Sequence, residues 1–190
     1  VPKRKLRIGY LSPDFRWHAV AHFLTPFLRD YSKLDFNVYC YQRGAADKVT
    51  RRFRRFAVVW RDVSELTNKE TARQIFEDKI DILVDFSGHS QGSCLPVMAL
   101  KPAPIQISAI GDIHTTGLRE MDYFLSDMTC LPPGKPVRGF TERIALLPYC
   151  HLCYAPEIIG ELPPAGGEPP VVKNGFVTFG SFNNFAKVSR

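Results

Sequence analysis

Short apolar runs alternate with longer amphipathic segments along most of this chain. The apolar runs predict strands near residues 6–11, 36–41, 58–60, 80–84, 105–110, 123–125 and 143–147. Between them, apolar residues three and four positions apart predict helices from about 19 to 31 and from about 68 to 78. Pro26 predicts a kink or a late start in the first helix. This alternation is typical of an α/β fold with a doubly wound parallel sheet and right-handed crossovers.

Polar loops follow several of these strands. The strand at 80–84 is almost continuously apolar, as expected of a central parallel strand that is covered on both faces. Ligands of such sheets bind beyond the carboxyl ends of the strands. We therefore expect His18, Ser90 and Thr115, which lie in loops after three different strands, to gather at one edge of the sheet.

The composition predicts one complete domain and the start of another. We expect a first domain over residues 1–160, a Pro- and Gly-rich linker over 161–175, and a truncated second domain over 176–190 that opens with a strand at 176–180.

Hydrophobic residues make up 45% and charged residues 23% of the chain, as in soluble globular proteins. No apolar run reaches the roughly 18–20 residues of a membrane span, so we expect no membrane partner. The five cysteines lack a regular framework, which favours reduced thiols and a cytoplasmic location.

Positive charge is concentrated in the first third of the chain. The net charge is +6, and residues 1–60 hold 13 Lys and Arg against 4 Asp and Glu. In the densest run, Arg51–Phe56, a helix would bury Phe53 and Phe56 and leave the arginines in water. The alternative is a nucleic-acid or other anionic partner. No recognisable nucleic-acid module accompanies the run, so we do not expect nucleic acid as a partner.

His18 is a candidate general base. It follows a Pro-Asp turn and precedes a predicted helix, whose positive N-terminal end favours the neutral imidazole. A neutral imidazole can accept a proton from a hydroxyl group, and Asp14 could orient it or act as the base itself. The alternative is a capping Asp14 beside an exposed His18. His22 shares the helical face of His18, but no zincin glutamate or third ligand is nearby in sequence, which favours a structural role.

The sequence offers little support for a metal or redox centre. No Asp-x-Asp pair, a carboxylate pair with which enzymes can hold a divalent cation, occurs in the sequence, which favours metal-free chemistry. Cys150 and Cys153 form a single C-x-x-C around His151, without a second cysteine pair or a thioredoxin-like context. We interpret this motif as structural.

Several motifs occur in the order found in one enzyme family. They are Ser12–Phe15 with His18 and His22, Asp85–Ser90, Lys101–Gln106, Thr115–Leu118, Met121–Tyr123 and Phe179–Asn184 with Lys187. The same order appears in the catalytic part of the O-GlcNAc transferase family, which this chain resembles over residues 5–190 outside the Pro-rich segment. The resemblance implies the amino-terminal, Rossmann-like half of a GT-B glycosyltransferase.

The resemblance also implies an activity and its partners. The full enzyme would be an inverting, metal-independent transferase that moves GlcNAc from the donor substrate UDP-GlcNAc to Ser or Thr of a protein or peptide acceptor, without a cofactor. It would need a second catalytic domain from the same chain, and we expect this fragment alone to be inactive. We also expect that the family's helical repeats are not part of it. Two alternatives are a non-catalytic sugar- or peptide-binding module and a basic nucleic-acid-binding α/β domain.

Individual site residues follow from the matched motifs. The resemblance implies that His18 lies at the sugar pocket as a proposed base, with Asp14 as the other candidate. It also implies that Ser90 and Gly111 contact the sugar and that Lys187 binds the diphosphate during catalysis.

The loop after Gly111 departs from the family pattern. Thr115 and Thr116 continue the implied sugar wall, but Asp112, Ile113 and His114 replace the expected Tyr-Pro-Gly. A carboxylate and an imidazole at these positions predict an altered sugar preference. We also expect Asp112 to have a hydroxyl, amide or cation partner, because an unpaired buried carboxylate is costly.

Overall fold

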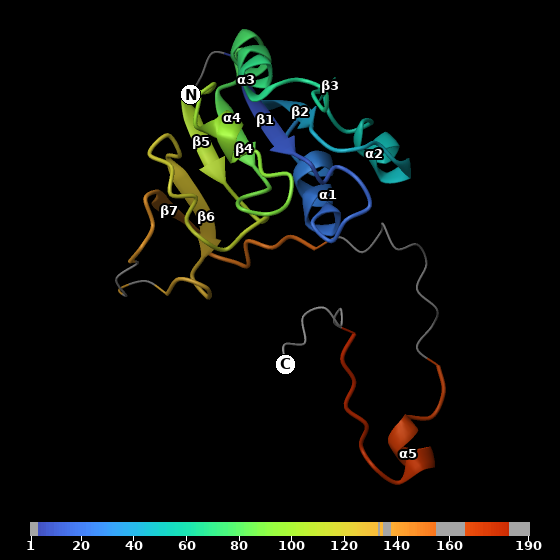
Figure 1. Ribbon diagram of the computed structural model, residues 1–190. Helices are drawn as coiled ribbons and strands as arrows, with labels where there is room; N and C mark the ends of the chain where they lie inside the picture. Colours follow the sequence, from blue (N-terminus) through green and yellow to red (C-terminus); the bar gives the residue numbers. More distant parts are fainter. Residues whose placement is uncertain (1–3, 133, 135–137, 155–165, 183–190) are drawn as a thin grey trace. The chain divides into compact units, whose positions relative to one another are not determined.

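Seven parallel strands form a single sheet in the computed structural model, which describes residues 4–132, 134, 138–154 and 166–182 (Figure 1). The strands are β1 (Leu6–Ser12), β2 (Phe36–Gln42), β3 (Val59–Asp62), β4 (Ile82–Asp85), β5 (Ile105–Ser108), β6 (Tyr123–Asp127) and β7 (Arg143–Leu147). Their order across the sheet is β3-β2-β1-β4-β5-β6-β7, and every neighbouring pair is parallel. The predicted doubly wound α/β fold is therefore confirmed.

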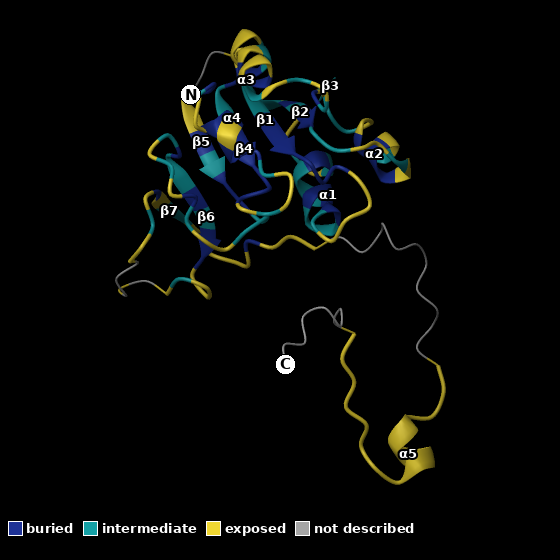
Figure 2. Ribbon diagram, in the orientation of Figure 1, coloured by how far each residue is buried: buried dark blue, intermediate teal, exposed yellow. Residues whose placement is uncertain are grey.

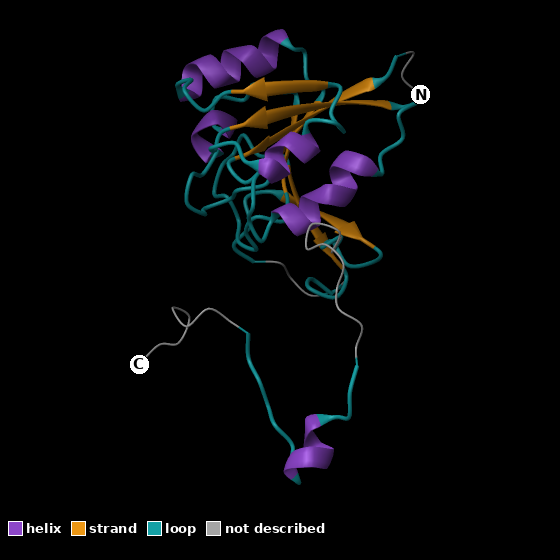
Figure 3. Cartoon of the chain, turned by 90° about the vertical axis from the view of Figure 1, so that its right-hand side faces the viewer, coloured by secondary structure: helices purple, strands orange, loops and turns teal. Residues whose placement is uncertain are grey.

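Helices cover both faces of this sheet (Figure 3). These helices are α1 (Ala21–Arg29), α2 (Lys48–Phe53), α3 (Asn68–Glu77) and α4 (Leu95–Met98), whereas α5 (Pro170–Asn174) belongs to a separate unit of the chain. Leu24 of α1 and Phe53 of α2 belong to the hydrophobic cluster on one face of the sheet, whereas Ile75 of α3 and Met98 of α4 belong to the cluster on the other. Figure 2 shows the strands between these layers as the most buried part of the fold. No helix of the described residues is both long and apolar enough to cross a bilayer.

The order of the strands reverses between β1 and β4. From β1 the chain first adds β2 and β3 on one side, and then returns to place β4 on the other side of β1. In an open parallel sheet, the loops that leave the two strands at such a reversal diverge to opposite faces and leave a crevice between them. The loops after β1 and β4 are therefore the best-placed ligand-binding loops of this fold.

Local sequence accounts for where two of the helices begin. Thr67 and Glu70 form a capping box at α3, and Asp47 and Thr50 form another at α2. Pro26 predicted a kink or a late start in the helix expected from about residue 19. Of these, the late start is not observed, because α1 begins at Ala21 and contains the proline. Its buried side chains, which include Leu24 and Leu28, supply the packing energy that offsets the lost backbone hydrogen bond.

The chain divides into one unit over Val1–Ile158 and a second over Ile159–Arg190. In the second unit, α5 occupies part of the predicted linker and ends at Gly175, whose φ of 73° is left-handed. The strand predicted at 176–180 is wrong, because the structure assigns no strand to these residues. A strand needs a hydrogen-bonded neighbour, and the described part of this unit supplies none. The predicted second domain stays a prediction.

Candidate functional site

The loop after β1 holds an acidic and a basic side chain beside each other. Asp14 is almost fully buried, and its backbone N–H donates to Oγ of Ser12 over 3.0 Å. One carboxylate oxygen of Asp14 lies 3.5 Å from Nδ1 of His18, and the other lies 3.5 Å from the Arg16 guanidinium. The backbone N–H of Val20 also approaches Nδ1 of His18, at 3.3 Å. The His18 side chain is 41% exposed, so its ring can meet a ligand from outside.

The loop after β4 is organised by a buried carboxylate. Asp85 accepts hydrogen bonds from the backbone N–H groups of Ser87 and Gly88, at 3.0 and 2.8 Å, and from Oγ of Ser87 at 2.5 Å. Burial raises the pKa of Asp85, and these hydrogen bonds oppose the rise. Ser90 donates its hydroxyl hydrogen to the Ser87 carbonyl over 2.6 Å. The Ser90 side chain thus helps to close the loop, while its oxygen can still accept a hydrogen bond.

The loops after β1 and β4 touch each other. The backbone N–H of Phe86 continues the sheet by donating to the Leu11 carbonyl, at 3.2 Å. Gly92 has a φ of +80°, and a Cβ built on it would lie 3.2 Å from Cβ of Pro13. His18 and Ser90 therefore sit in adjoining loops at the carboxyl edge of the sheet, as predicted.

The loop after β5 packs tightly on the loop after β4. A Cβ on Gly111 would lie 2.0 Å from the Phe86 carbonyl oxygen, and a Cβ on Gly88 would lie 2.4 Å from Cβ of Asp112. Gly111 is thus required by the neighbouring backbone, whatever it contacts in a complex. The Asp112 carboxylate accepts hydrogen bonds from the N–H of His89 at 3.3 Å and from the N–H of His114 at 3.0 Å, and it contacts Nδ1 of His114 at 2.6 Å.

These contacts supply the partner that Asp112 was expected to need. Burial opposes ionisation of Asp112, but the hydrogen bonds from His114 and His89 outweigh it and lower the pKa. The His114 side chain is 74% exposed and the Asp112 side chain is 18% exposed. Of this pair, the imidazole is therefore the solvent-exposed member, and the carboxylate holds it in place.

Thr115 and Thr116 bind a buried carboxylate. Glu142, immediately before β7, accepts hydrogen bonds from Oγ1 of Thr115 at 2.7 Å and from the N–H of Thr116 at 2.7 Å, and Oγ1 of Thr116 also donates to it. Although burial opposes ionisation of Glu142, these hydrogen bonds lower the pKa. Thr116 is 5% exposed and Glu142 is 7% exposed. The two threonines thus fasten the loop after β5 to the start of β7.

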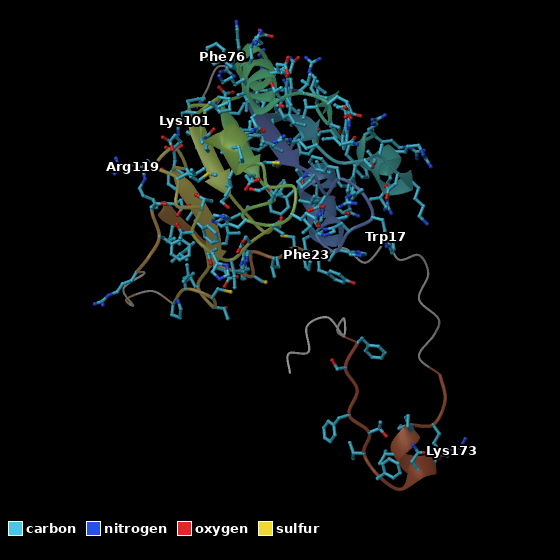
Figure 4. All side chains as sticks on the ribbon, viewed as in Figure 1. Trp17, Phe23, Phe76, Lys101, Arg119 and Lys173 are labelled. Carbon is cyan, nitrogen blue, oxygen red and sulfur yellow. The ribbon has the colours of Figure 1, made fainter. Side chains whose placement is uncertain are left out.

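A surface hollow lies at the opposite edge of the sheet. It has a volume of about 760 Å³, and Phe76 and Lys101 help to line it. Figure 4 shows these two residues at the other end of this unit from Trp17 and Phe23. Lys101 is paired with Asp122 at 2.6 Å, so the Lys101–Gln106 and Met121–Tyr123 motifs are joined by an ion pair at the amino edge. We therefore give these motifs a structural role.

The model of the Glycosyl transferase family 41 matches residues 1–154. This range includes the three loops just described. The chain belongs to glycosyl transferase family 41.

Curated and solved members of this family extend well beyond the present chain. The chain is 40% identical over 195 residues to the probable UDP-N-acetylglucosamine–peptide N-acetylglucosaminyltransferase SPINDLY of Arabidopsis thaliana, which covers 99% of the chain and 21% of that relative. It is 32% identical over 151 residues to the UDP-N-acetylglucosamine–peptide N-acetylglucosaminyltransferase of Caenorhabditis elegans. The matched region covers 77% of this chain and 13% of that relative. A solved O-GlcNAc transferase mutant from Thermobaculum terrenum superposes with a TM-score of 0.76 and 38% identity, over 87% of this chain and 31% of that one. The chain thus spans about a fifth of the length of its first curated relative.

Family membership leaves the individual roles of the site residues as predictions. The predicted diphosphate ligand Lys187 lies outside the described residues. Sequence reasoning missed His89, whose Nε2 lies 3.0 Å from the Thr115 carbonyl oxygen, and it also missed Glu142. His89 could have been found, because it lies between Gly88 and Ser90 in a motif that was already recognised. Nothing in the sequence marks Glu142, since its partners are 26 and 27 residues away.

Proposed function

We propose that this chain is the amino-terminal part of the catalytic region of an inverting glycosyltransferase that moves GlcNAc from UDP-GlcNAc to Ser or Thr of a protein or peptide. The observation that carries this proposal is the family 41 match over the residues that form the three adjoining loops. A second catalytic domain, from the same chain, would complete the donor site.

The proposed reaction is a single displacement at the anomeric carbon of the sugar. The acceptor hydroxyl oxygen forms a bond to the anomeric carbon. At the same time the bond between that carbon and the diphosphate oxygen breaks, and UDP leaves with the electron pair. The hydroxyl proton passes to a base of the enzyme. Attack from the face opposite the leaving group inverts the configuration and produces a β-linked product.

His18 is our first choice for the base. Its partly exposed ring can meet an acceptor hydroxyl, and the nearby Asp14 carboxylate can hold a proton on Nδ1, which leaves the Nε2 lone pair free. The two groups are 3.5 Å apart in the absence of substrate, and catalytic hydrogen bonds of this kind often shorten only in the complex. Should the N–H of Val20 keep Nδ1 as an acceptor, Nε2 would carry the proton and Asp14 would be the base.

The loops after β4 and β5 would form the wall of the sugar site. Ser90, the backbone at Gly111 and the exposed imidazole of His114 supply the polar groups that face out of these loops. Lys187 would neutralise the leaving diphosphate without a metal ion, as a positioned cation can. The free cysteines support a cytoplasmic setting for the reaction.

Product analysis of the full-length protein tests this proposal. With UDP-GlcNAc and a Ser- or Thr-containing peptide, we expect a β-linked GlcNAc-peptide and an equal amount of UDP. Its formation should require neither Mg²⁺ nor Mn²⁺. An α-linked product, or a rate that vanishes until one of these cations is added, would contradict the mechanism.

A further inference from the structure

Three aromatic rings form a row that begins beside the candidate base. Trp17, the residue directly before His18, contacts the ring of His22 with 6.0 Å between the ring centroids. The ring of His22 also contacts that of Tyr154, again at 6.0 Å, and Tyr154 contacts Phe23 of α1 at 5.8 Å. Trp17, His22 and Tyr154 are therefore continuous, and we call them the aromatic row.

The two outer rings of the aromatic row are open to a partner. Trp17 is 56% exposed and Tyr154 is 57% exposed, whereas His22 between them is partly buried. Nδ1 of His22 is buried and has no hydrogen-bond partner among the described residues, so this nitrogen does not hold the ring, which packs between its two neighbours. Exposed Trp and Tyr offer a large, rigid apolar surface that loses little side-chain entropy on binding, and both are enriched at protein interfaces.

Trp17 is fixed in place before any ligand binds. Its backbone N–H donates to the Asp47 carboxylate at 2.7 Å, and Asp47 is the N-cap residue of α2. The Lys48 ammonium lies 5.6 Å from the centre of the Trp17 ring, within the range of a cation–π interaction. The loop that carries Trp17 is thus tied to α2, which lowers the cost of ordering it in a complex.

The chemistry of the transfer separates the acceptor from the nucleotide. This step rests on the proposed function, in which the acceptor hydroxyl attacks from the face opposite the leaving diphosphate. The base must lie within hydrogen-bond reach of that hydroxyl, so the surface beside the base is on the acceptor side of the sugar. Because Trp17 adjoins His18 along the chain, the aromatic row lies on the acceptor side and not beside the uridine.

The spacing of the rings fits an extended acceptor segment. In an extended peptide, the side chains two residues before and after the reactive Ser or Thr point to the same side as its hydroxyl, about 6.6 Å away. The aromatic row begins next to His18 and advances by 6.0 Å from each ring to the next. A peptide whose hydroxyl meets the base would therefore present these side chains to the row.

We propose that Trp17 and Tyr154 bind the acceptor protein and select apolar or aromatic side chains two residues away from the glycosylated Ser or Thr. The two rings provide apolar contact area, and His22 holds them apart as a spacer. Trp17 and Tyr154 are thus specificity-determining residues for the acceptor, while the proton transfer itself stays with the Asp14–His18 pair.

Two peptides with a single serine test the proposal on the full-length protein. One has phenylalanine two residues before and after the serine, and the other has glycine at both places. The wild type should favour the phenylalanine peptide at least about tenfold in kcat/KM, mainly through KM, since Trp and Tyr commonly dominate binding at interfaces. Trp17→Ala and Tyr154→Ala should each reduce this preference to about threefold or less. Trp17→Phe keeps an aromatic ring and should retain most of it.

A matched control and a binding measurement complete the test. Phe76 is an exposed aromatic residue at the other end of this unit (Figure 4), so Phe76→Ala should leave the preference unchanged. A labelled phenylalanine peptide with alanine in place of its serine measures binding without catalysis. Fluorescence anisotropy should show that Trp17→Ala weakens binding of this peptide at least about tenfold, while the affinity for UDP stays that of the wild type.

The proposal would be overturned by a wild type that treats the two peptides alike, or by a folded Trp17→Ala variant that keeps the preference. It would also be overturned if Trp17→Ala weakened UDP binding as much as peptide binding, because Trp17 would then contact the nucleotide. If the wild type transfers GlcNAc to neither peptide, the proposed function fails. The anisotropy comparison then supports or overturns the binding surface by itself.

Discussion

Replacing Thr116 by Val tests whether this threonine stabilises the fold or is free to contact a sugar. The substitution keeps the shape of the side chain and removes the hydroxyl that donates to Glu142. Because Glu142 is a buried carboxylate, the loss should cost about 1.5–3 kcal/mol of the free energy of unfolding, the range for hydrogen bonds to charged groups. With a urea dependence of about 2 kcal/mol per molar, the unfolding midpoint should fall by about 1 M.

Two variants control this measurement. Thr116→Ser keeps the hydroxyl and should retain most of the stability. Thr71→Val makes the same change at a fully buried threonine whose Oγ1 has no hydrogen-bond partner. Since no interaction is lost there and an unpaired polar atom is removed, Thr71→Val should be neutral or stabilising. Urea unfolding of the isolated chain, followed by circular dichroism, compares the wild type with all three variants.

The pH dependence gives a second, independent signature. The folded-state pKa of Glu142 is lowered by its hydrogen bonds, so its contribution to stability is complete above the unfolded pKa of about 4.3. That contribution is lost as the pH falls through the lower, folded-state pKa. The difference between the wild type and Thr116→Val should therefore be full at pH 7 and shrink below about pH 4. Equal urea midpoints at pH 7, or a difference that is the same in acid, would refute the structural role of the pair.

Three further predictions concern function. In the full-length protein, His18→Ala should leave folding intact and lower turnover about a hundredfold or more. Activity within about threefold of the wild type would show that His18 is not the base, and that either Asp14 or neither of the two residues has this role. Asp112→Asn should change the preference among UDP-sugars in a competition assay. An unchanged preference for UDP-GlcNAc would show that the difference from the family pattern at residues 112–114 has only a structural role. The isolated chain should be folded and inactive, and it should bind UDP-GlcNAc only weakly in calorimetry. A single lysine, Lys187, attracts a diphosphate by only about 1 kcal/mol in water, whereas micromolar binding needs about 8 kcal/mol. A dissociation constant in the low micromolar range would place the nucleotide site within this chain.

The sheet could be predicted because its signals are local. Each strand of the first unit was expected from a short apolar run, and the edge that gathers His18 and Ser90 followed from parallel topology alone. The strand at 176–180 was wrong because strand formation depends on a partner, which an apolar run by itself does not supply. The helix expected from about residue 19 to residue 31 is present as α1 with Pro26 inside it, since tertiary packing of Leu24 and Leu28 offsets the local effect of the proline.

The network within the site could not be predicted, because it depends on contacts far apart in sequence. The chemistry of Asp112 did require a partner, but only the folded chain identifies it as His114 and the N–H of His89. The two threonines read as sugar contacts from their motif, yet their hydroxyls reach Glu142, 26 and 27 residues away. Likewise, the Cys130 thiol lies near His151 only because β6 and β7 are neighbours in the sheet.

The carboxylates at the binding edge differ in one respect that bears on catalysis. Asp85, Asp112 and Glu142 each accept several hydrogen bonds of 3.3 Å or less from the loops that they join, so their lone pairs are engaged in holding the wall together. Asp14 instead lies 3.5 Å from the Arg16 guanidinium and 3.5 Å from Nδ1 of His18. A carboxylate that takes part in proton transfer must be able to form a new, short contact as the reaction proceeds, and a carboxylate that stabilises loops must not exchange its contacts. This difference separates the tightly hydrogen-bonded loops after β4 and β5 from the loosely held Asp14–His18 pair after β1, and it is the reason why we propose that the base lies in this pair.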